Sequence, residues 1–274
     1  MYIDGRGIRD RIQAELTLAV SRRSKTPCLA IVIIGSNPVI EGFVRAKKRF
    51  AETIGVEFNE YRFEESISED EILRVLEELA RDQKVSGIVV QLPLSEHLGV
   101  DRILNAIPAA KDVDVLSHEA LNSFSLGTLK ILPPVVGAVQ EILREGNVVP
   151  QGRKALVVGQ GRLVGVPVAV WLRQEGAQVT VVGEPTEKLS DFTKTADLIV
   201  SGAGSPGLIQ PEMLTPGVVL IDAGSSESLG KIVGDVDPAC ESLASVMTPV
   251  PGGVGPVTVA VLFRNLIILS DREA

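Results

Sequence analysis

The chain has 274 residues, of which 45% are hydrophobic and 23% charged, a composition typical of an ordinary soluble protein. This length suits one large domain or two domains of modest size. The formal charge of −8 offers no general attraction to nucleic acid or to an anionic membrane, so we expect neither as a partner. The short basic run at 45–49 is a local exception.

Cysteine and histidine usage argues against a disulfide framework and a local metal site. Cys28 and Cys240 lie far apart, and His97 and His118 lack the spacing of a metal-binding pair. The N-terminus has no hydrophobic signal segment, and no apolar run approaches the roughly 18 residues of a membrane-spanning helix. We therefore expect a cytoplasmic protein without a bound metal.

Short apolar runs alternate with amphipathic stretches in the first half of the chain. Residues 29–34 and 87–92 have the length and β-branched content of buried strands. Residues 39–54 and 70–81, which lie between them, have helical periodicity. This order predicts βαβ units.

The second half repeats the order with more regular spacing. Strands are predicted at 155–158, 178–182, 198–201 and 218–222, spaced as successive strands of a parallel sheet. We therefore predict two α/β domains, the C-terminal one a Rossmann-type parallel sheet. The boundary is expected near the helical stretch 136–144.

A glycine-rich turn follows the first strand of the second half and precedes a helical stretch. It contains Gly159, Gln160, Gly161, Val164 and Gly165, and its glycines permit close approach of a phosphate group. The helix that follows would direct free N–H groups at a pyrophosphate. The spacing is GxGxxxG in place of GxGxxG, and a tight turn that binds no ligand is the alternative.

Glu184 follows the second strand of the same half, where a Rossmann domain places the carboxylate that binds the adenosine ribose. A carboxylate suits a free 2′-hydroxyl better than a 2′-phosphate, because two anionic groups repel each other. Glu184 also fits a solvated turn, so this residue alone leaves the choice between NAD and NADP open.

Lys47 interrupts an apolar helical face. Helical spacing places it between Phe43 and Phe50, on the face that also carries Val39 and Ile54. A partly desolvated ammonium has a lowered pKa and can exchange protons near neutral pH. The alternative is a lysine whose stem packs while its amine reaches water.

Three further polar side chains lie at or beyond the strand predicted at 87–92. Gln91 stands at its carboxyl end, where open α/β sheets assemble ligand sites, although it equally fits a structural strand end. Asp112 and Asp114 alternate in an extended stretch, so at most one of them faces a site. From spacing alone, both are solvated turn acids.

Prolines and glycines dominate residues 248–256, directly before an apolar stretch. Proline fixes φ and removes an amide donor, whereas Gly252 and Gly253 allow a close approach that a Cβ would prevent. This order predicts a shaped loop that feeds a helix and lies against a ligand. A surface turn is the alternative.

Five motifs occur in the order seen in one enzyme family. They are Gly87-Ile88-Val89-Val90-Gln91-Leu92-Pro93-Leu94, Lys111-Asp112-Val113-Asp114, Val164-Gly165-Val166-Pro167, Gly234-Asp235-Val236-Asp237 and Thr248-Pro249-Val250-Pro251-Gly252-Gly253-Val254-Gly255-Pro256. Through them, the chain resembles the bifunctional methylenetetrahydrofolate dehydrogenase/methenyltetrahydrofolate cyclohydrolase family over nearly its whole length.

The resemblance implies two activities in one-carbon metabolism that serve purine biosynthesis. The chain would oxidise 5,10-methylenetetrahydrofolate with NAD or NADP and hydrolyse the 5,10-methenyl product to 10-formyltetrahydrofolate. It implies a folate-binding catalytic domain at 1–137 with 253–274, a Rossmann domain at 138–252, a cleft between them, and a homodimer.

The resemblance also implies roles for single residues. Lys47 matches the catalytic lysine, Gln91 the glutamine that adjusts it, and Asp114 the aspartate that grips the pterin. The other substrate-binding residues would be Phe43, Leu92, Pro93, Pro251, Gly252 and Gly253, and the cofactor-binding residues Gly159, Gln160, Gly161, Val164, Gly165, Glu184 and Ser225.

Several positions depart from the family pattern. Phe43 replaces the usual tyrosine, which removes a phenol hydrogen bond and puts cyclohydrolase efficiency in question, and Val115 replaces the usual glycine. The usual Cys-Thr-Pro is absent from 132–137. Gln160-Gly161 replaces Arg-Ser, and Glu184 lies near the usual His-Ser, so NAD should serve at least as well as NADP.

Two other functional classes stay open at this point. A non-catalytic or single-activity folate- or nucleotide-binding paralogue would explain Phe43 and the altered phosphate loop. A shikimate-dehydrogenase-like oxidoreductase would share the two-domain plan, but it would not explain Gln91 together with the proline-glycine loop.

Overall fold

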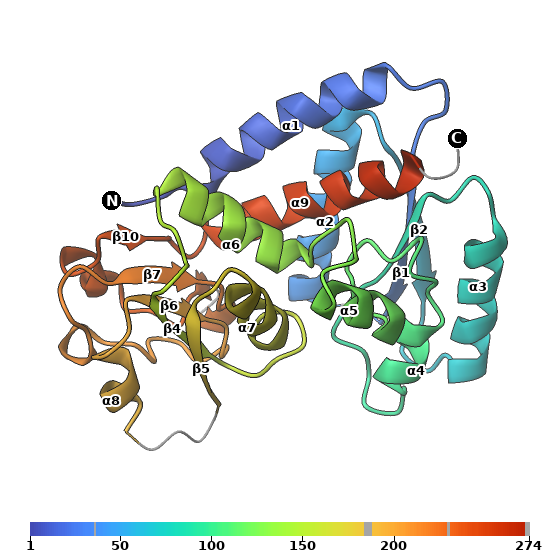
Figure 1. Cartoon of the computed structure of the whole chain (residues 1–274). Helices are drawn as coiled ribbons and strands as arrows, with labels where there is room; N and C mark the ends of the chain where they lie inside the picture. The colour runs from blue at the N-terminus through green and yellow to red at the C-terminus, as the bar shows by residue number, and fades with distance from the viewer. Residues whose placement is uncertain (36, 184–187, 229–230, 272–274) are drawn as a thin grey trace. The chain divides into compact units, whose positions relative to one another are not determined.

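The computed structural model describes residues 1–35, 37–183, 188–228 and 231–271. The chain forms two compact units, each built from two segments. The first unit contains residues 10–134 and 259–274, and the second contains residues 1–9 and 135–258. The chain passes between the units within helices α1 (Gly5–Ser21) and α9 (Val254–Ser270) and at the start of α6 (Pro134–Glu145) (Figure 1).

The first unit is built on a three-stranded parallel sheet in the order β2-β1-β3. The strands are β1 (Cys28–Ile34), β2 (Glu57–Phe63) and β3 (Gly87–Val90). The other helices of this unit are α2 (Pro38–Ile54), α3 (Glu69–Arg81), α4 (Val100–Asn105) and α5 (His118–Ser125).

Strand β1 is buried along its whole length, as its continuous apolar run predicts. Val32 shares a core with Ile72 and Leu76 of α3, the helix drawn beside the sheet in Figure 1. Gly87 of β3 packs closely against Leu266 of α9 and lies near Leu29: a Cβ at position 87 would be only 2.6 Å from the Leu266 side chain. Because full burial of a large aliphatic side chain stabilises a fold by roughly 1.5–3 kcal/mol, these contacts hold the sheet in place.

Helix α2 begins and ends at residues that satisfy its free backbone groups. The Asn37 side chain accepts a hydrogen bond from the Ile40 N–H at 2.9 Å, and Pro38 occupies the first helical position. At the other end, Gly55 adopts a left-handed conformation with φ of 77°. These caps fix the helix that carries Lys47.

The second unit is a five-stranded parallel sheet in the order β10-β7-β6-β4-β5. The order reverses at β4, which places the switch point of the sheet beside the turn after this strand. The strands are β4 (Lys154–Val158), β5 (Gln178–Val182), β6 (Leu198–Ser201), β7 (Val219–Asp222) and β10 (Val246–Met247). The helices are α6, α7 (Gly165–Gln174), α8 (Leu189–Thr193), η1 (Pro211–Met213) and η2 (Pro238–Ser242), with a β8 (Ser226–Ser228) and β9 (Lys231–Val233) hairpin.

The first residues of the chain pack in the second unit. The Ile3 N–H donates to the Met247 carbonyl at 2.9 Å, and the Gly5 N–H donates to the Gly252 carbonyl at 2.9 Å. The predicted domain boundaries assign residues 1–9 to the folate-binding part, whereas these bonds group them with residues 135–258.

The α/β class and the parallel sheet of the second half are confirmed. Strand β3 ends at Val90, so Gln91 lies just beyond the strand. The helix expected after the proline-glycine loop already begins at Val254. Helix α1 and strand β2 lie in segments where no element was predicted. Among the described residues, no helix has the length and apolar content to cross a bilayer.

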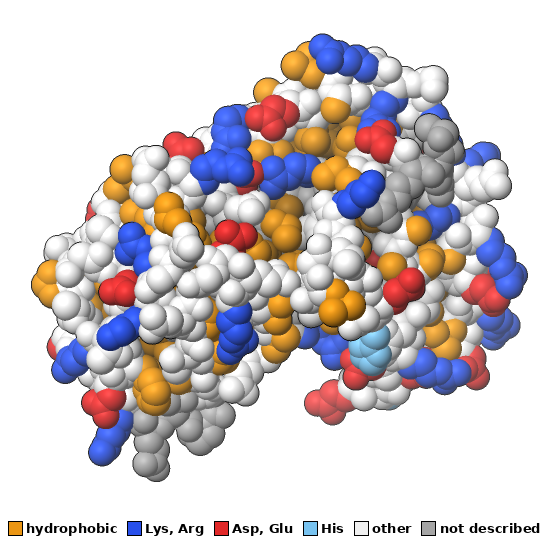
Figure 2. Space-filling model, viewed as in Figure 1, with side chains coloured by type: hydrophobic (Ala, Val, Ile, Leu, Met, Phe, Trp, Pro, Cys, Tyr) orange, Lys and Arg blue, Asp and Glu red, His pale blue; other side chains and the backbone are white. Residues whose placement is uncertain are grey.

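Basic and acidic side chains are interspersed on the face of the molecule drawn in Figure 2. Several exposed pairs are within ion-pair distance, such as Lys48 Nζ with Glu60 at 3.0 Å and Arg62 with Glu41 at 2.7 Å. Lys48 belongs to the basic run at 45–49, so part of the charge of this run is balanced within the same unit. Exposed pairs of this kind stabilise a fold by at most about 1 kcal/mol.

Candidate functional site

Helix α2 presents Lys47 on its buried side. Ile40, Val44 and Ile54 are buried on this side, and Lys47 is half-buried among them. The predicted face was partly wrong, because Phe43 is 41% exposed. The buried face of α2 includes Ile40 and Val44 in place of Phe43, so the Phe43 ring stays accessible.

Lys47 and Gln91 form a direct hydrogen bond in the first unit. Lys47 Nζ donates to Gln91 Oε1 at 2.8 Å, and Gln91 Nε2 donates to the Leu92 carbonyl at 2.8 Å. The second bond orients the amide so that its oxygen, not its nitrogen, meets the lysine. Gln91 is 7% exposed, so its side chain is a fixed part of the site.

Asp114 supplies the opposing charge near this pair. Burial lowers the pKa of Lys47, and the charge of Asp114 acts against that effect. Burial likewise raises the pKa of Asp114 to about 6, while the charge of Lys47 opposes the rise. Both groups therefore have pKa values shifted toward neutrality, which suits proton exchange.

The two alternating acids have different surroundings. Asp112 is 1% exposed, and its Oδ2 accepts hydrogen bonds from the backbone N–H groups of Leu116 and Ser117 at 2.9 and 2.7 Å. Asp114 is half-buried and interacts with the Lys47 charge. The prediction that both were solvated on spacing alone was wrong, because the loop folds back onto the unit.

Val115 keeps a backbone conformation that favours glycine. Its φ is 57°, and its side chain is fully buried. A left-handed conformation costs a residue with a Cβ roughly 1–2 kcal/mol. Val115 therefore adopts the left-handed turn after Asp114 with its β-branched side chain buried.

The remaining predicted folate contacts of the first unit lie next to Gln91. Leu92 is half-buried against the core that α3 and β1 share, and Pro93 is exposed. The peptide bond between Leu92 and Pro93 is cis. Phe43, Leu92 and Pro93 thus retain accessible surface in the same unit as Lys47.

In the second unit, the glycine-rich turn after β4 closes tightly on itself. Gly159 has φ of 105°, and a Cβ there would lie 2.6 Å from the Gly202 carbonyl. A Cβ at Gly165, the first residue of α7, would lie 2.0 Å from the Gly159 carbonyl. The Val164 side chain packs against Gly202: a Cβ at position 202 would lie 2.4 Å from it. These positions shape the turn itself.

Gly161 differs from the other glycines of this turn. A Cβ there would have no neighbour within 4 Å among the described residues, so the fold leaves open space above its backbone. The turn follows β4 at the switch point of the sheet and precedes the N-terminus of α7. An open glycine backbone at this place fits the pyrophosphate of a nicotinamide dinucleotide.

Gln160 reaches from this turn to the end of β5. Its side-chain amide lies against Gly183, where a Cβ would be 3.0 Å from the Gln160 amide carbon. Glu184, the predicted ribose-binding acid, lies outside the described residues. Ser225 is exposed in the turn after β7, at the same carboxyl edge of the sheet.

The proline-glycine loop belongs to the second unit. Gly252 has φ of 112°, and its carbonyl accepts the Gly5 N–H. A Cβ at Gly253 would lie 2.5 Å from the Pro249 carbonyl. These glycines therefore serve the close packing of the loop on itself and on the N-terminal segment, while Pro251 is exposed.

Two buried aspartates that were not predicted as site residues hold the turns at the same sheet edge. Asp235 accepts hydrogen bonds from the Ser201 hydroxyl at 2.7 Å and from the backbone N–H of Ala203 at 2.7 Å. Asp222 accepts from the N–H of Gly224 at 2.9 Å, and burial raises its pKa to about 6. The motif Gly234-Asp235-Val236-Asp237 was the only sequence signal of this arrangement.

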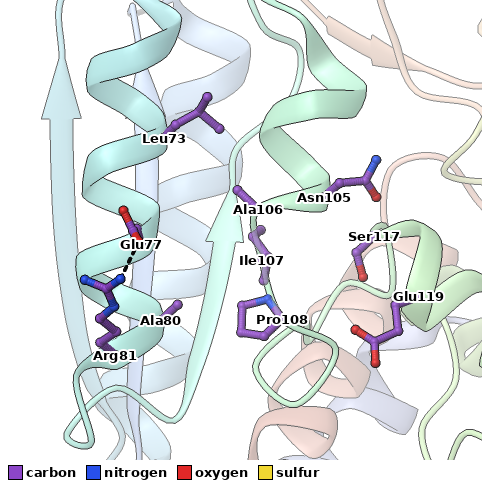
Figure 3. Close-up of a pocket in the computed structure, with 10 residues that line it drawn as sticks. All are labelled: Leu73, Glu77, Ala80, Arg81, Asn105, Ala106, Ile107, Pro108, Ser117 and Glu119. Atoms are coloured by element: carbon purple, nitrogen blue, oxygen red, sulfur yellow. Dashed lines mark hydrogen bonds and ion pairs between the residues drawn. The ribbon is translucent and has the colours of Figure 1, made fainter.

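A separate hollow of about 620 Å³ lies between α3, α4 and α5 (Figure 3). Glu77 and Arg81, which form an ion pair, lie on one side of it, and Pro108 and Glu119 lie across from them. None of the predicted site residues lines it. The residues that carry the predicted chemistry gather elsewhere in the first unit.

Comparison with known proteins matches both halves of the chain to one family. Residues 3–114 match the family described as "Tetrahydrofolate dehydrogenase/cyclohydrolase, catalytic domain", and residues 133–274 match its "NAD(P)-binding domain". The chain belongs to the tetrahydrofolate dehydrogenase/cyclohydrolase family. Both matches describe a folate family, so the shikimate-dehydrogenase-like alternative is not supported.

Three relatives illustrate the breadth of the match. The bifunctional protein FolD of Acetivibrio thermocellus is 35% identical over 99% of this chain and 97% of its own length. The crystal structure of FolD from Campylobacter jejuni has a TM-score of 0.96 at 34% identity, covering 100% of this chain and 99% of that one. The Trypanosoma brucei FolD structure, complexed with NADP cofactor and inhibitor, has a TM-score of 0.95 at 32% identity, covering 99% and 97%.

Proposed function

We propose that this chain oxidises 5,10-methylenetetrahydrofolate with NAD or NADP and hydrolyses the 5,10-methenyl product to 10-formyltetrahydrofolate. The observation that carries the proposal is the 2.8 Å hydrogen bond between Lys47 and Gln91, with the Asp114 charge nearby, in a chain of this family. A non-catalytic paralogue would have no need of a half-buried lysine with a lowered pKa.

Lys47 is the proton-transfer residue of the hydrolytic step. Water adds to the carbon that joins N5 and N10, and a neutral Lys47 amine accepts the proton that the water loses. The lysine then returns a proton to N5 as the bond from carbon to N5 breaks, and the hydroxyl proton is released as the formyl group forms. The lowered pKa of Lys47 increases the fraction of neutral amine available.

Gln91 and Asp114 prepare the lysine and the substrate. Gln91 Oε1 accepts from the Lys47 amine and so orients its nitrogen lone pair once the proton is lost. Asp114 grips the polar edge of the pterin, whose N–H groups are hydrogen-bond donors suited to a carboxylate. Phe43, with 41% of its surface exposed, supplies a ring face for stacking, although it lacks the phenol of the usual tyrosine.

The second unit holds the dinucleotide through the turn after β4. When bound, the dinucleotide would supply the hydride acceptor for the one-carbon bridge of the folate. The backbone at Gly161 and the first turn of α7 would bind the pyrophosphate, and Ser225 lies at the same sheet edge. Gly159, Val164 and Gly165 act indirectly, because they shape this turn.

We expect NAD to serve at least as well as NADP. Gln160 has no charge with which to bind a 2′-phosphate, and its amide lies against Gly183 at the end of β5. An amide in this position suits the ribose hydroxyls. The identity of Glu184 in the sequence favours the same choice.

Three broader expectations complete the proposal. The family resemblance implies a homodimer, and the two cysteines, which lie far apart in the sequence, fit a reducing cytoplasm. Formation of 10-formyltetrahydrofolate would link the protein to purine biosynthesis. Sedimentation of the purified chain at several concentrations tests the dimer, and a monomer throughout would contradict it.

A paired assay tests the two activities. Reduction of NAD or NADP with 5,10-methylenetetrahydrofolate measures the dehydrogenase, and loss of 5,10-methenyltetrahydrofolate absorbance measures the cyclohydrolase. Both activities are expected. Absence of both, with retained folate binding, would instead identify a binding paralogue, and loss of one would identify a single-activity enzyme.

A further inference from the structure

Asp112 is a buried acid for which the proposed reaction has no role. Only 1% of its surface is exposed, and its Oδ2 accepts hydrogen bonds from the backbone N–H groups of Leu116 and Ser117. These bonds close the loop over the residues in between, which include Asp114. Burying a carboxylate costs free energy, and the hydrogen bonds from Leu116 and Ser117 offset part of that cost.

The backbone before Asp114 is anchored independently of Asp112's carboxylate. The Ile88 N–H donates to the Lys111 carbonyl at 2.8 Å, and residue 112 continues as a parallel bridge to Ile88 of β3. Asn265 of α9 then donates its side-chain amide to the Val113 carbonyl at 2.9 Å. The chain is thus fixed up to Val113.

The backbone after Asp114 turns back onto Asp112. Val115 lies in the left-handed region with φ of 57°, which a β-branched residue adopts only when its surroundings enforce it. The Val115 N–H donates to the Asp112 backbone carbonyl at 3.4 Å, a long bond, and the shorter bonds from the N–H groups of Leu116 and Ser117 to the Asp112 carboxylate close the same turn. Asp112 therefore holds the turn that the Val115 side chain disfavours.

Asp114 lies between the anchored stretch and this turn. Within the described part of the chain its carboxylate accepts no hydrogen bond, and it interacts with Lys47 through charge. Its direction is therefore set by the backbone on either side. We propose that Asp112 is a positioning residue, which holds the left-handed turn at Val115 and thereby directs Asp114 toward Lys47 and the folate. This inference rests on the proposed role of Asp114 in folate binding.

Three variants test whether Asp112 acts through the turn. Asp112→Ala removes both accepted bonds, whereas Asp112→Asn keeps an oxygen that can accept them. The double variant Asp112→Ala with Val115→Gly restores a residue that adopts positive φ without the Cβ penalty. The measurements are kcat and KM for the folate and for NAD or NADP, with thermal unfolding as a check on folding.

The expected results separate positioning from general damage. Asp112→Ala should lower kcat/KM for the folate by about tenfold to a hundredfold, and KM for the dinucleotide should change by less than about twofold. Asp112→Asn should stay within about threefold of the wild type, because the hydrogen-bonding pattern is kept. The double variant should recover part of the loss of Asp112→Ala.

Opposite results would overturn the inference. A folded Asp112→Ala protein with wild-type folate kinetics would show that Asp114 needs no such support. A loss in Asp112→Asn equal to that of Asp112→Ala, or no recovery in the double variant, would show that Asp112 does not act through the turn. If the alanine variant does not fold, the other two variants decide. Asp112→Asn must stay within about threefold of the wild type, and the double variant must fold and turn over the folate; failure of either would overturn the inference.

Asp82→Asn is the matched control. The Asp82 carboxylate also accepts a backbone hydrogen bond, from the Lys84 N–H at 2.8 Å, in the same unit. Its kinetics should match the wild type. Failure of the proposed function can be told apart from failure of this inference, because the wild-type protein would then lack both activities. The Asp112 variants would in that case be compared with the wild type by their binding of 5,10-methenyltetrahydrofolate in a titration.

Discussion

Lys47 of α2 and Gln91 of the turn after β3 meet in a 2.8 Å hydrogen bond, although 44 residues separate them in the chain. The bond joins the group with the lowered pKa to a neutral amide that cannot itself take up its proton. A lysine in this setting stays free to exchange protons, whereas a carboxylate at the same distance would hold it protonated.

Replacing Lys47 with methionine should abolish hydrolysis and spare part of the oxidation. The methionine fills a similar volume but carries no proton, so we expect cyclohydrolase kcat to fall by about a hundredfold or more. Hydride transfer depends on alignment and should fall less. Stopped assays of both reactions on Lys47→Met test this.

Lys48→Met is the control for that change, because Lys48 is the next residue in the helix and pairs with Glu60 on the surface. It should keep both activities. Hydrolysis at the wild-type rate in Lys47→Met would refute the assignment of the proton-transfer residue.

Asp114 should impose a pH dependence on folate binding. Its pKa is raised to about 6 by burial, so its carboxylate is charged only above that pH. KM for the folate should therefore rise as pH falls through about 6, and Asp114→Asn should have a higher KM with little pH dependence in this range. Most of the titration of Asp114 falls within roughly one pH unit on either side of its pKa. A wild-type KM that does not change from pH 5 to 7 would therefore contradict the role of Asp114.

The same group affects stability in a defined direction. Because the folded-state pKa of about 6 exceeds the ordinary 3.8, the folded protein binds this proton more tightly than the unfolded chain does. The free energy of unfolding of the wild type, relative to Asp114→Asn, should therefore fall as pH rises from about 4 to about 6 and be level above that. Urea unfolding of both proteins across this range measures the difference; a rise would refute it.

Gln160 should influence the choice between NAD and NADP. Gln160→Arg introduces a cation beside Gly183, and a charge-assisted bond to the 2′-phosphate should raise kcat/KM for NADP relative to NAD by about tenfold. Gln178→Arg adds the same charge at the exposed start of β5 and should leave the ratio unchanged. A strong NADP preference in the wild type would already contradict the expected choice.

The glycines of the turn after β4 should separate into two kinds. Gly165→Ala places a methyl group 2.0 Å from the Gly159 carbonyl, so the free energy of unfolding should fall by about 1–3 kcal/mol. Thermal unfolding should move to lower temperature accordingly. Gly161→Ala meets no atom within 4 Å in the described chain, so the fold should tolerate it while KM for the dinucleotide rises. Equal KM values for Gly161→Ala and the wild type would remove Gly161 from the cofactor site.

The parts of the fold with a strong local period were predictable, and the parts fixed by distant contacts were not. The apolar run of β1 and the helical period of α2 predicted these two elements correctly. The orientation of α2 was misjudged at Phe43, because its side chain lies beside the buried face and not within it. Gln91 was found because ligand groups gather at the carboxyl ends of parallel strands.

Other site features had no local signal. Spacing could not distinguish Asp112 from Asp114, because their roles depend on a loop that folds back onto β3. The bonds of Asp222 and Asp235 were also hidden, since they join turns that follow different strands. The left-handed Val115 contradicts the usual preference of its residue type, so only the structure could reveal it.

The pairing of Ile3 with Met247 and of Gly5 with Gly252 has a consequence for synthesis on the ribosome. Residues 3 and 5 have their partners at 247 and 252, and the first unit likewise takes its closing helix from residues 259 onward. Neither unit can therefore cover its apolar surface until these later segments have been synthesised. Removing residues 247–270 would leave both units incomplete.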